Sequence, residues 1–200
     1  MIFQVQSWVS ASGGWCEQAM GGHAFDAKLA DRLSYFFSNK KVASFGDGPG
    51  EYKKYIDDTK RATEYVAYDG SPYGPLTSKG RVNFLDLSAP QYGLPLYDWI
   101  ISLEVAEHIP SQYESIYIDN IVRHANEGIV ISWAVPGQGG QSHVNCRPFS
   151  YVKDLLFKHG FIHNLTASWD LRGSASLEWL QRNTNVFERK NDSPLDPNDI

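Results

Sequence analysis

The chain has 200 residues, which is long enough for one well-buried domain and short for two. Its composition, 42% hydrophobic and 20% charged, is that of a globular protein, and its formal net charge of −5 disfavours a nucleic-acid partner. No run approaches the ~18 apolar residues of a membrane-spanning helix, and the first residues show neither the basic leader nor the apolar core of a signal peptide. We therefore expect a cytoplasmic protein without membrane contact.

Short apolar runs alternate with helical patterns through most of the sequence. In chain order, the predicted elements are a helix over 25–37, a strand over 41–45, a helix over 51–58, strands over 65–68, 82–85 and 99–103, a helix over 112–124, a strand over 128–133, a helix over 149–159, and final strands within 161–169 and over 185–187. This alternation predicts an α/β fold with a mainly parallel sheet that helices cover on both faces.

We expect a single domain over residues 1–190, with an N-terminal cap and helix region (1–39) and a core (40–190). Residues 191–200 are polar, acidic and broken by proline, so we expect a disordered tail. The abrupt start and loose end would also suit a domain of a larger protein. The two cysteines, Cys16 and Cys146, are too few for a disulfide framework and are expected to be reduced packing thiols.

A glycine-rich segment, Gly46-Asp47-Gly48-Pro49-Gly50, stands between the first predicted strand and the helix after it. Glycine there lets the backbone turn sharply and approach a ligand closely. The dinucleotide fingerprint G-x-G-x-x-G would need glycine at position 51, where Glu51 stands, so a nicotinamide-dependent dehydrogenase is disfavoured. A simple turn is the alternative interpretation.

Two aspartates follow the next two predicted strands. Asp69 lies about 20 residues beyond the glycine segment, where a carboxylate can accept from both hydroxyls of a ribose. Asp86 follows the strand after that and could accept from an adenine amino group. Each could instead cap a turn at a strand end. Their order behind the glycine segment favours a nucleoside-containing cofactor.

These pieces, VASFGDGPG, AYDG, NFLDL and YDWIISLEVAEHIP, resemble class I S-adenosylmethionine-dependent methyltransferases over about residues 40 to 190. The pieces GGWC, IVRHANEGIVISWA and GQGGQSHVNC are similar to the methyltransferase-like protein 24 group. The resemblance implies a Rossmann-like, doubly wound, seven-stranded sheet that is mainly parallel, with an antiparallel last strand at 185–187.

The same resemblance implies a binding mode for S-adenosyl-L-methionine. It places Gly46, Asp47, Gly48 and Gly50 along the methionine part, Asp69 at the ribose, Asp86 and Leu87 at the adenine, and Leu103 near the sulfonium. One position departs from the family, because Ser44 stands where an acidic residue usually orders the glycine loop. A serine hydroxyl can still hydrogen-bond the loop, so cofactor binding is still implied, with altered affinity.

Glu104, Glu107 and His108 gather three ionisable side chains directly behind the apolar run 99–103. If this segment forms a helix, the three side chains share one face, because they are three and four residues apart. Oxygen and nitrogen ligands on one face could hold a divalent cation. The alternative is a helix start without metal, where the macrodipole favours carboxylates and where His108 or His143 would be the general base.

The Glu-x-x-Glu-His pattern is similar to that of two methyltransferase families, the small-RNA 2′-O-methyltransferases and the ubiquinone-pathway O-methyltransferases. In both, the motif is associated with a divalent metal, and in the first a distal histidine completes the site. The resemblance implies a Mg²⁺ or Mn²⁺ site at Glu104, Glu107, His108 and His143, with Glu107, His108 and His143 as catalytic residues. A cation there would lower the pKa of an attacking hydroxyl and fix it in line with the methyl group.

We therefore expect S-adenosylmethionine-dependent O-methylation of an acceptor with neighbouring hydroxyls. A saccharide, a catechol-like ring and the terminal ribose of RNA all fit, and the acidic net charge disfavours RNA. Trp8, Trp15, Trp133 and Tyr73 could stack on a sugar or a planar ring, and we favour the sugar. His23 could reach the pocket as a lid residue. The alternative of another class is an interaction module that binds the cofactor without catalysis.

Overall fold

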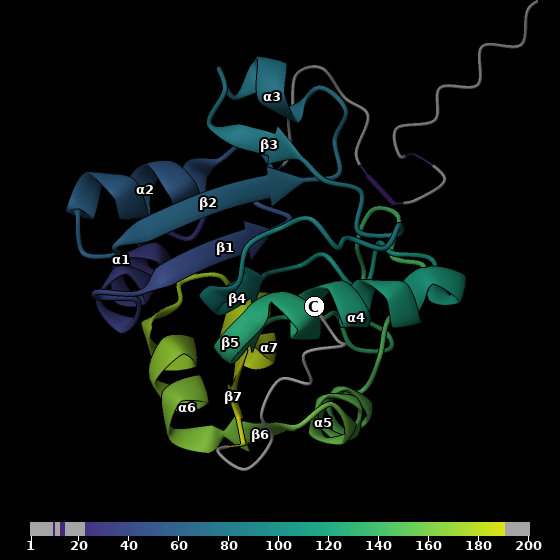
Figure 1. The fold of residues 1–200 in the computed structure, drawn as a ribbon. Helices are drawn as coiled ribbons and strands as arrows, with labels where there is room; N and C mark the ends of the chain where they lie inside the picture. Colours follow the sequence, from purple (N-terminus) through teal and green to yellow (C-terminus); the bar gives the residue numbers. More distant parts are fainter. Residues whose placement is uncertain (1–9, 11–12, 15–22, 191–200) are drawn as a thin grey trace, which may run out of the picture.

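Within the described residues, seven strands form one sheet in the order β3-β2-β1-β4-β5-β7-β6 (Figure 1). The neighbouring strands from β3 to β5 are parallel, and β7 is antiparallel to both β5 and β6. The strands are β1 (Lys41–Phe45), β2 (Glu64–Asp69), β3 (Val82–Phe84), β4 (Tyr97–Ser102), β5 (Ala125–Ile131), β6 (Phe161–Asn164) and β7 (Asn185–Arg189). The predicted Rossmann-like sheet with an antiparallel last strand is confirmed.

The computed structural model describes residues 10, 13–14 and 23–190. The expectations for Trp8, Trp15, Cys16 and the tail 191–200 lie outside these residues. The helices are α1 (Ala27–Phe36), α2 (Glu51–Thr59), α3 (Gly74–Thr77), the 3₁₀ helix η1 (Ser111–Tyr113), α4 (Glu114–His124), α5 (Phe149–Lys158), α6 (Leu165–Ser174) and α7 (Glu178–Asn183). No helix in the described part is long and apolar enough to span a bilayer.

Helices cover both faces of the sheet, and each face has its own apolar cluster (Figure 1). On one side, α1, α2, α6 and α7 pack on alternate strand residues such as Val42, Ile101 and Val130. On the other side, α4 and α5 pack on neighbours such as Ile100 and Ile129. Consecutive residues of a strand point to opposite faces, so a strand buried on both faces is apolar throughout. This is why the sequence allowed β1, β4 and β5 to be predicted from their apolar runs.

The prediction of a strand within 161–169 is wrong in its second half. β6 ends at Asn164, and α6 begins at the next residue. The Asn164 side chain accepts a hydrogen bond from the backbone N–H of Ala167 at 2.9 Å, which is an N-cap interaction. The apolar residues beyond it therefore belong to a helix that packs on β7 rather than to a strand.

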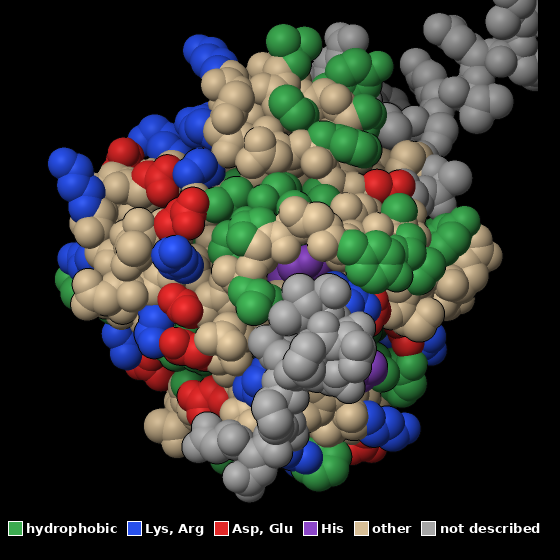
Figure 2. Space-filling view, viewed as in Figure 1, with side chains coloured by type: hydrophobic (Ala, Val, Ile, Leu, Met, Phe, Trp, Pro, Cys, Tyr) green, Lys and Arg blue, Asp and Glu red, His purple; other side chains and the backbone are tan. Residues whose placement is uncertain are grey.

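The sheet edge at β3 is short. β3 has three residues, and a short edge strand limits the backbone available for pairing with another chain. Phe84 on this strand and Leu76 on α3 are exposed by 52% and 80%. Figure 2 shows hydrophobic side chains gathered over this region, apart from the lysines and arginines over α1 and α2.

Gly128 in β5 should not tolerate a methyl group. A Cβ atom at this position would lie 2.4 Å from Cζ3 of Trp99 and 2.6 Å from the carbonyl oxygen of Phe187. We expect Gly128→Ala to lower the free energy of unfolding by about 1–3 kcal/mol, since overpacking forces the indole or the backbone to move. Urea denaturation measures this. Gly93→Ala, where no atom of the described residues lies within 4 Å of the added Cβ, is the matched control and should change stability little; equal effects would contradict the packing argument.

Candidate functional site

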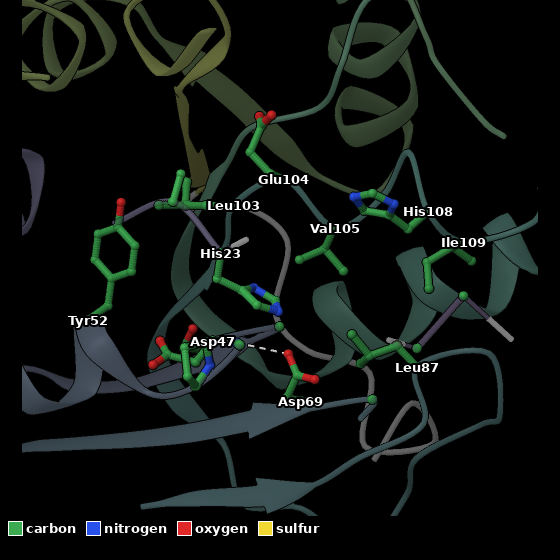
Figure 3. A pocket seen from close by; sticks show the side chains of 18 of the residues that line it. His23, Asp47, Tyr52, Asp69, Leu87, Leu103, Glu104, Val105, His108 and Ile109 are labelled. Atoms are coloured by element: carbon green, nitrogen blue, oxygen red, sulfur yellow. Dashed lines mark hydrogen bonds between the residues drawn. The ribbon is translucent and has the colours of Figure 1, made fainter. Parts of the chain in front are cut away.

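A cavity of about 470 Å³ opens at the carboxyl ends of the parallel strands (Figure 3). Loops after β1, β2, β3 and β4 line it, together with the segment after β5 and part of α7. This is the edge at which parallel α/β sheets bind ligands, and the size falls within the usual range of small-molecule sites. Of the residues expected to bind a cofactor, those lining the cavity are Gly46, Asp47, Gly48, Asp69, Asp86, Leu87 and Leu103.

The glycine segment turns tightly beneath the cavity. The N–H groups of Gly46 and Asp47 both donate to the carbonyl oxygen of Tyr68, at 2.8 and 2.9 Å. Gly46 has φ 97°, and a Cβ atom there would lie 2.2 Å from Cγ2 of Val105. A larger residue would thus collide with the segment that follows β4, so glycine is needed for the close approach of the two loops.

Gly50 differs from Gly46 and Gly48 in its surroundings. It precedes α2 in a left-handed conformation, and a Cβ atom there would lie 2.8 Å from Cγ2 of Val82. It is not among the residues that line the cavity. Its left-handed backbone conformation and its packing on Val82 already favour glycine at this position.

The Asp47 carboxylate anchors the loop from within. It is 7% exposed and accepts from the backbone N–H of Lys53 at 3.2 Å and from the hydroxyl of Tyr65 at 3.2 Å, with Ser44 beside it. Burial raises the pKa of this carboxyl to about 6, although these hydrogen bonds oppose the shift. Asp47 thus supplies a buried carboxylate under the loop. It lies beside Ser44, which stands where methyltransferases of the resembling family usually have an acidic residue.

Asp69 and Asp86 lie where the sequence predicted them, at the ends of β2 and β3. Asp69 accepts from the N–H of Gly48 at 2.8 Å (Figure 3) and from that of Ser71 at 2.8 Å. Asp86 accepts from the N–H and the hydroxyl of Ser88. Both carboxylates therefore cap turns after their strands, which is the alternative that the sequence left open for these two aspartates. A carboxylate has about four lone-pair sites, so these bonds leave capacity for a ligand in the cavity.

The segment after β4 is a turn and not a helix, which corrects the conditional expectation for Glu104, Glu107 and His108. Glu104 has φ 55°, in the left-handed region that ends regular structure. Its N–H donates to the hydroxyl oxygen of Ser132 at 2.8 Å, and that hydroxyl donates to Glu104 Oε1 at 2.8 Å. These two hydrogen bonds join Glu104 to Ser132, the residue after β5, in place of the hydrogen bonds that Glu104 would make within a helix.

Three of the four expected metal ligands nevertheless come together. Potential ligand atoms of Glu107, His108 and His143 all lie within 4.8 Å of one another, and Glu104 is outside this group. Glu107 Oε1 is 4.0 Å from Nε2 of His143, and the two imidazole rings stand edge to face with centroids 5.1 Å apart. His143 comes from the loop after β5, so the predicted meeting of two strand ends occurs.

The electrostatics of this cluster are unusual. Glu107 is fully buried, and neither carboxylate oxygen has a hydrogen-bond partner among the described residues. Burial, reinforced by the charge of Glu104, raises the pKa of Glu107 well above its ordinary value. Burial and the neighbouring His143 lower the pKa of His108 to about 4. An orphaned buried carboxylate beside two imidazoles is costly unless a proton or cation completes it.

Several cavity residues were not singled out from sequence as ligand-contacting. Gly13 and Gly14 pack against backbone, because Cβ atoms there would lie 2.3 Å from the carbonyl oxygens of His108 and Gly70. Tyr52, Gln138 and Trp179 also line the cavity. The Gly-Gly pair beside Trp15 was a visible signal, whereas the helical positions of Tyr52 and Trp179 gave none.

His23 lines the cavity as expected, against Gly48, whose Cβ would lie 2.6 Å from its Nδ1. Trp133 is buried, donates to the carbonyl oxygen of Asn145 and does not line the cavity, and neither does Tyr73. Their proposed stacking role is therefore not supported. Cys146 is a free, half-buried thiol 4.0 Å from Nδ1 of His143.

Solved structures share this fold. The magnesium protoporphyrin IX methyltransferase (ChlM) of Synechocystis PCC 6803, with bound SAH, has TM-score 0.61 and 16% identity, over 82% of this chain and 83% of that one. The sugar N-methyltransferase KedS8 of Streptoalloteichus sp. ATCC 53650 has TM-score 0.61 and 12% identity, over 82% and 86%. A pericyclic reaction enzyme has TM-score 0.55 and 14% identity, over 86% and 50%.

No family model matches the sequence, and no curated protein matches it. At these identities, the likeness shows the class I methyltransferase fold. Because the same fold also occurs in a pericyclic reaction enzyme, the fold does not by itself set the reaction. Function has to be argued from the residues of the cavity.

The buried carboxyl of Asp47 should make stability depend on pH. Its pKa of about 6 in the folded chain exceeds the ordinary 3.8, so the folded state binds the proton more tightly. The contribution of this group to stability is therefore fully present below about pH 4, falls as pH rises from about 4 to about 6, and then stays level, a loss of about 3 kcal/mol. Urea denaturation from pH 4 to 8 should show that Asp47→Asn lacks this loss; parallel pH profiles would contradict it.

Proposed function

We propose that this chain is an S-adenosyl-L-methionine-dependent O-methyltransferase, assisted by a divalent cation, that acts on a saccharide or a similar acceptor with neighbouring hydroxyls. The observation that carries the proposal is one cavity whose floor is the glycine loop and whose wall includes His108 and His143. Solved structures of the same fold include methyltransferases with bound SAH and SAM, which supports this cofactor. Both halves of a methyl-transfer site thus have candidate residues at one sheet edge.

The cofactor half rests on contacts that the loops already make. The turn through Gly46 and Gly48 leaves room for the methionine part, and the Asp69 carboxylate faces the cavity beside Gly48 (Figure 3). Buried Leu87 supplies an apolar surface for the adenine ring next to the Asp86 carboxylate. Leu103 also lines the cavity and is the apolar side chain that we assign to the surroundings of the reactive methyl group.

The cation half rests on Glu107, His108 and His143. The donor set of one carboxylate and two imidazoles fits a divalent ion such as Mn²⁺, and such an ion would supply the partner that the buried Glu107 oxygens lack among the described residues. Such an ion, when bound, would act as a Lewis acid on an acceptor hydroxyl. The protein's own part is to hold the three ligands apart from water and close to the donor methyl, so that the acceptor is oriented before reaction.

The aromatic lining of the cavity favours a saccharide acceptor. The aromatic side chains that line the cavity, Phe25, Tyr52 and Trp179, offer flat faces of the kind that bind sugar rings. Neighbouring hydroxyls would also match a cation with open coordination positions. A screen of labelled-methyl transfer to sugars, catechols and RNA, with and without Mn²⁺, tests this choice directly; transfer only to a non-hydroxyl acceptor would overturn it.

Asp69 should be essential for cofactor binding. We expect Asp69→Ala to weaken S-adenosylmethionine binding by at least about thirtyfold, because a lost charge-assisted pair of hydrogen bonds to the ribose costs about 2 kcal/mol or more. Titration calorimetry with S-adenosylmethionine measures the dissociation constants of the native chain and of the variant. Asp98→Ala is the control, since Asp98 also accepts a backbone N–H, from Lys41 at 2.7 Å, but at the opposite end of the strands. Absence of binding to the native chain would contradict the proposed function.

The cation site should be separable from cofactor binding. We expect His143→Ala and Glu107→Gln to weaken Mn²⁺ binding at least about tenfold while S-adenosylmethionine still binds, since each removes one ligand. Calorimetry with each ligand measures both effects. His159→Ala, which removes an exposed imidazole just after α5, should leave both unchanged. Methyl transfer that survives a chelator and both substitutions would rule out the cation.

A further inference from the structure

A buried carboxylate joins two segments that are far apart in the sequence. Asp26 precedes α1 and is fully buried, and its Oδ1 atom accepts from the N–H of Leu29 at 3.0 Å, which caps that helix. Its Oδ2 atom accepts from the N–H groups of Ser176 and Leu177, at 2.6 and 2.7 Å. The Ser176 hydroxyl donates to Oδ1 at 2.9 Å. Asp26 therefore caps α1 and also holds the loop that leads into α7.

These hydrogen bonds keep the Asp26 side chain ionised. Burial by itself raises the pKa of this carboxyl, but the hydrogen bonds from Leu29, Leu177 and Ser176 outweigh burial and hold the pKa below its ordinary value. Hydrogen bonds to an ionised acceptor are shorter and stronger than those between neutral groups. The connection between the two segments is thus made by charge-assisted hydrogen bonds at neutral pH.

Both segments that Asp26 joins carry residues of the cavity lining. Residues 23–25 line the cavity immediately before Asp26, and Trp179 and Leu180 line it from the start of α7, just after Leu177. The hydrogen bond from Leu177 to Asp26 spans 151 residues of the chain. Asp26 thus connects two parts of the cavity lining that the sequence keeps far apart.

The first of these segments reaches the glycine loop. A Cβ atom at Gly48 would lie 2.6 Å from Nδ1 of His23, and Figure 3 shows the His23 imidazole on the side of the cavity where Asp69 lies. Tyr52, whose hydroxyl oxygen accepts from the backbone N–H of Asp26 at 3.4 Å, also lines the cavity. The position of Asp26 therefore sets how this segment lies against the loop that we assign to the methionine part of the cofactor.

Both helices next to these segments have apolar attachments that do not depend on Asp26. Leu29 of α1 and Leu180 of α7 belong to the same apolar cluster on one face of the sheet. Apolar burial is the dominant favourable contribution to folding, so the helices should stay docked when the carboxylate is removed. The change should fall mainly on residues 23–25 and on the loop at 176–177.

We infer that Asp26 is a positioning residue for S-adenosylmethionine, because it fixes residues 23–25 and the start of α7 relative to each other. The inference rests on the proposed function. With both segments held, this part of the lining is ordered before the cofactor arrives, so its ordering does not oppose binding. Without the carboxylate, the binding-competent arrangement is only a fraction of the ensemble, and the apparent affinity falls in proportion to that fraction.

Asp26→Ser separates this positioning role from helix capping. Serine is a good N-cap residue, so the N–H of Leu29 keeps an acceptor, but no atom replaces Oδ2, and the bonds from the N–H groups of Ser176 and Leu177 are lost. If the competent arrangement falls to about a tenth of the population, S-adenosylmethionine binds about tenfold more weakly. Titration calorimetry measures this loss, at a temperature where thermal denaturation shows each variant to be folded.

Asp26→Asn is the conservative variant, because its amide oxygen can take the place of Oδ2 and still accept from both backbone N–H groups. It should bind S-adenosylmethionine more tightly than Asp26→Ser does. Asn164→Ala is the matched control, because it removes the N-cap of α6, whose residues do not line the cavity. It should lower the melting temperature by about 2–4 °C and leave the affinity for S-adenosylmethionine unchanged.

The outcomes separate the inference from the proposed function. Native affinity in Asp26→Ser would overturn the inference, and so would an equal loss of affinity in Asn164→Ala, which would indicate general destabilisation. Binding by Asp26→Asn that is no tighter than that by Asp26→Ser would overturn the role of the Oδ2 contacts. If the native chain does not bind S-adenosylmethionine, the proposed function itself fails, and the inference fails with it.

Discussion

The carbonyl oxygen of Glu107 joins the two loops that build the site. It accepts the backbone N–H groups of both Val144 and Asn145, at 2.8 and 3.0 Å, and so fixes the loop after β5 on the turn after β4. His143 directly precedes this pair and is thereby placed against the Glu107 carboxylate. A Cβ atom at Gly140 would lie 2.1 Å from Nε2 of His143, so the same loop also needs glycine to fold over its own imidazole.

The carboxylates at the two ends of the sheet have different kinds of partner. At the amino ends of the strands, Lys40 pairs with Glu127 at 2.6 Å, and the indole N–H of Trp99 donates to the same carboxylate. At the carboxyl ends, Asp69 accepts from the backbone N–H of Gly48 and Glu104 from the hydroxyl of Ser132, and none of the ion pairs among the described residues includes either carboxylate. Paired charges hold the sheet together at one end, whereas unpaired charges at the other end are the kind of arrangement that functional sites retain at a cost in stability.

Much of the architecture could be predicted from sequence because buried parallel strands are apolar along their whole length. The strand at 41–45 matches β1, and Asp69 and Asp86 stand at the strand ends where they were expected. The turn at Glu104 could not be predicted, because its left-handed conformation depends on the hydroxyl of Ser132, 28 residues away. Local spacing can indicate a helix, but it carries no information about such a long-range partner.

Among the site residues too, some placements were predicted from sequence and others depend on contacts that the sequence does not indicate. The partnership of Glu107 with His143 was predicted from the rule that adjacent strand ends meet, and the structure brings them together. The exclusion of Glu104 from that group follows from the turn and not from its residue type. Gly50 was assigned to the ligand from its place in a motif, yet its environment is the Val82 side chain. Motif position indicates where a residue lies, whereas its contacts decide what it does.

Gly13 and Gly14 bring the segment ahead of the first strand into the wall of the cavity. These two residues lie against the backbone at the ends of β2 and β4, far ahead in sequence of the first strand. A shortened chain starting at Lys41 would lose one wall of the cavity, including His23, and also α1, whose buried Leu29 and Leu33 belong to the apolar cluster on one face of the sheet. The segment ahead of the first strand therefore belongs to both the folding core and the cavity of this protein.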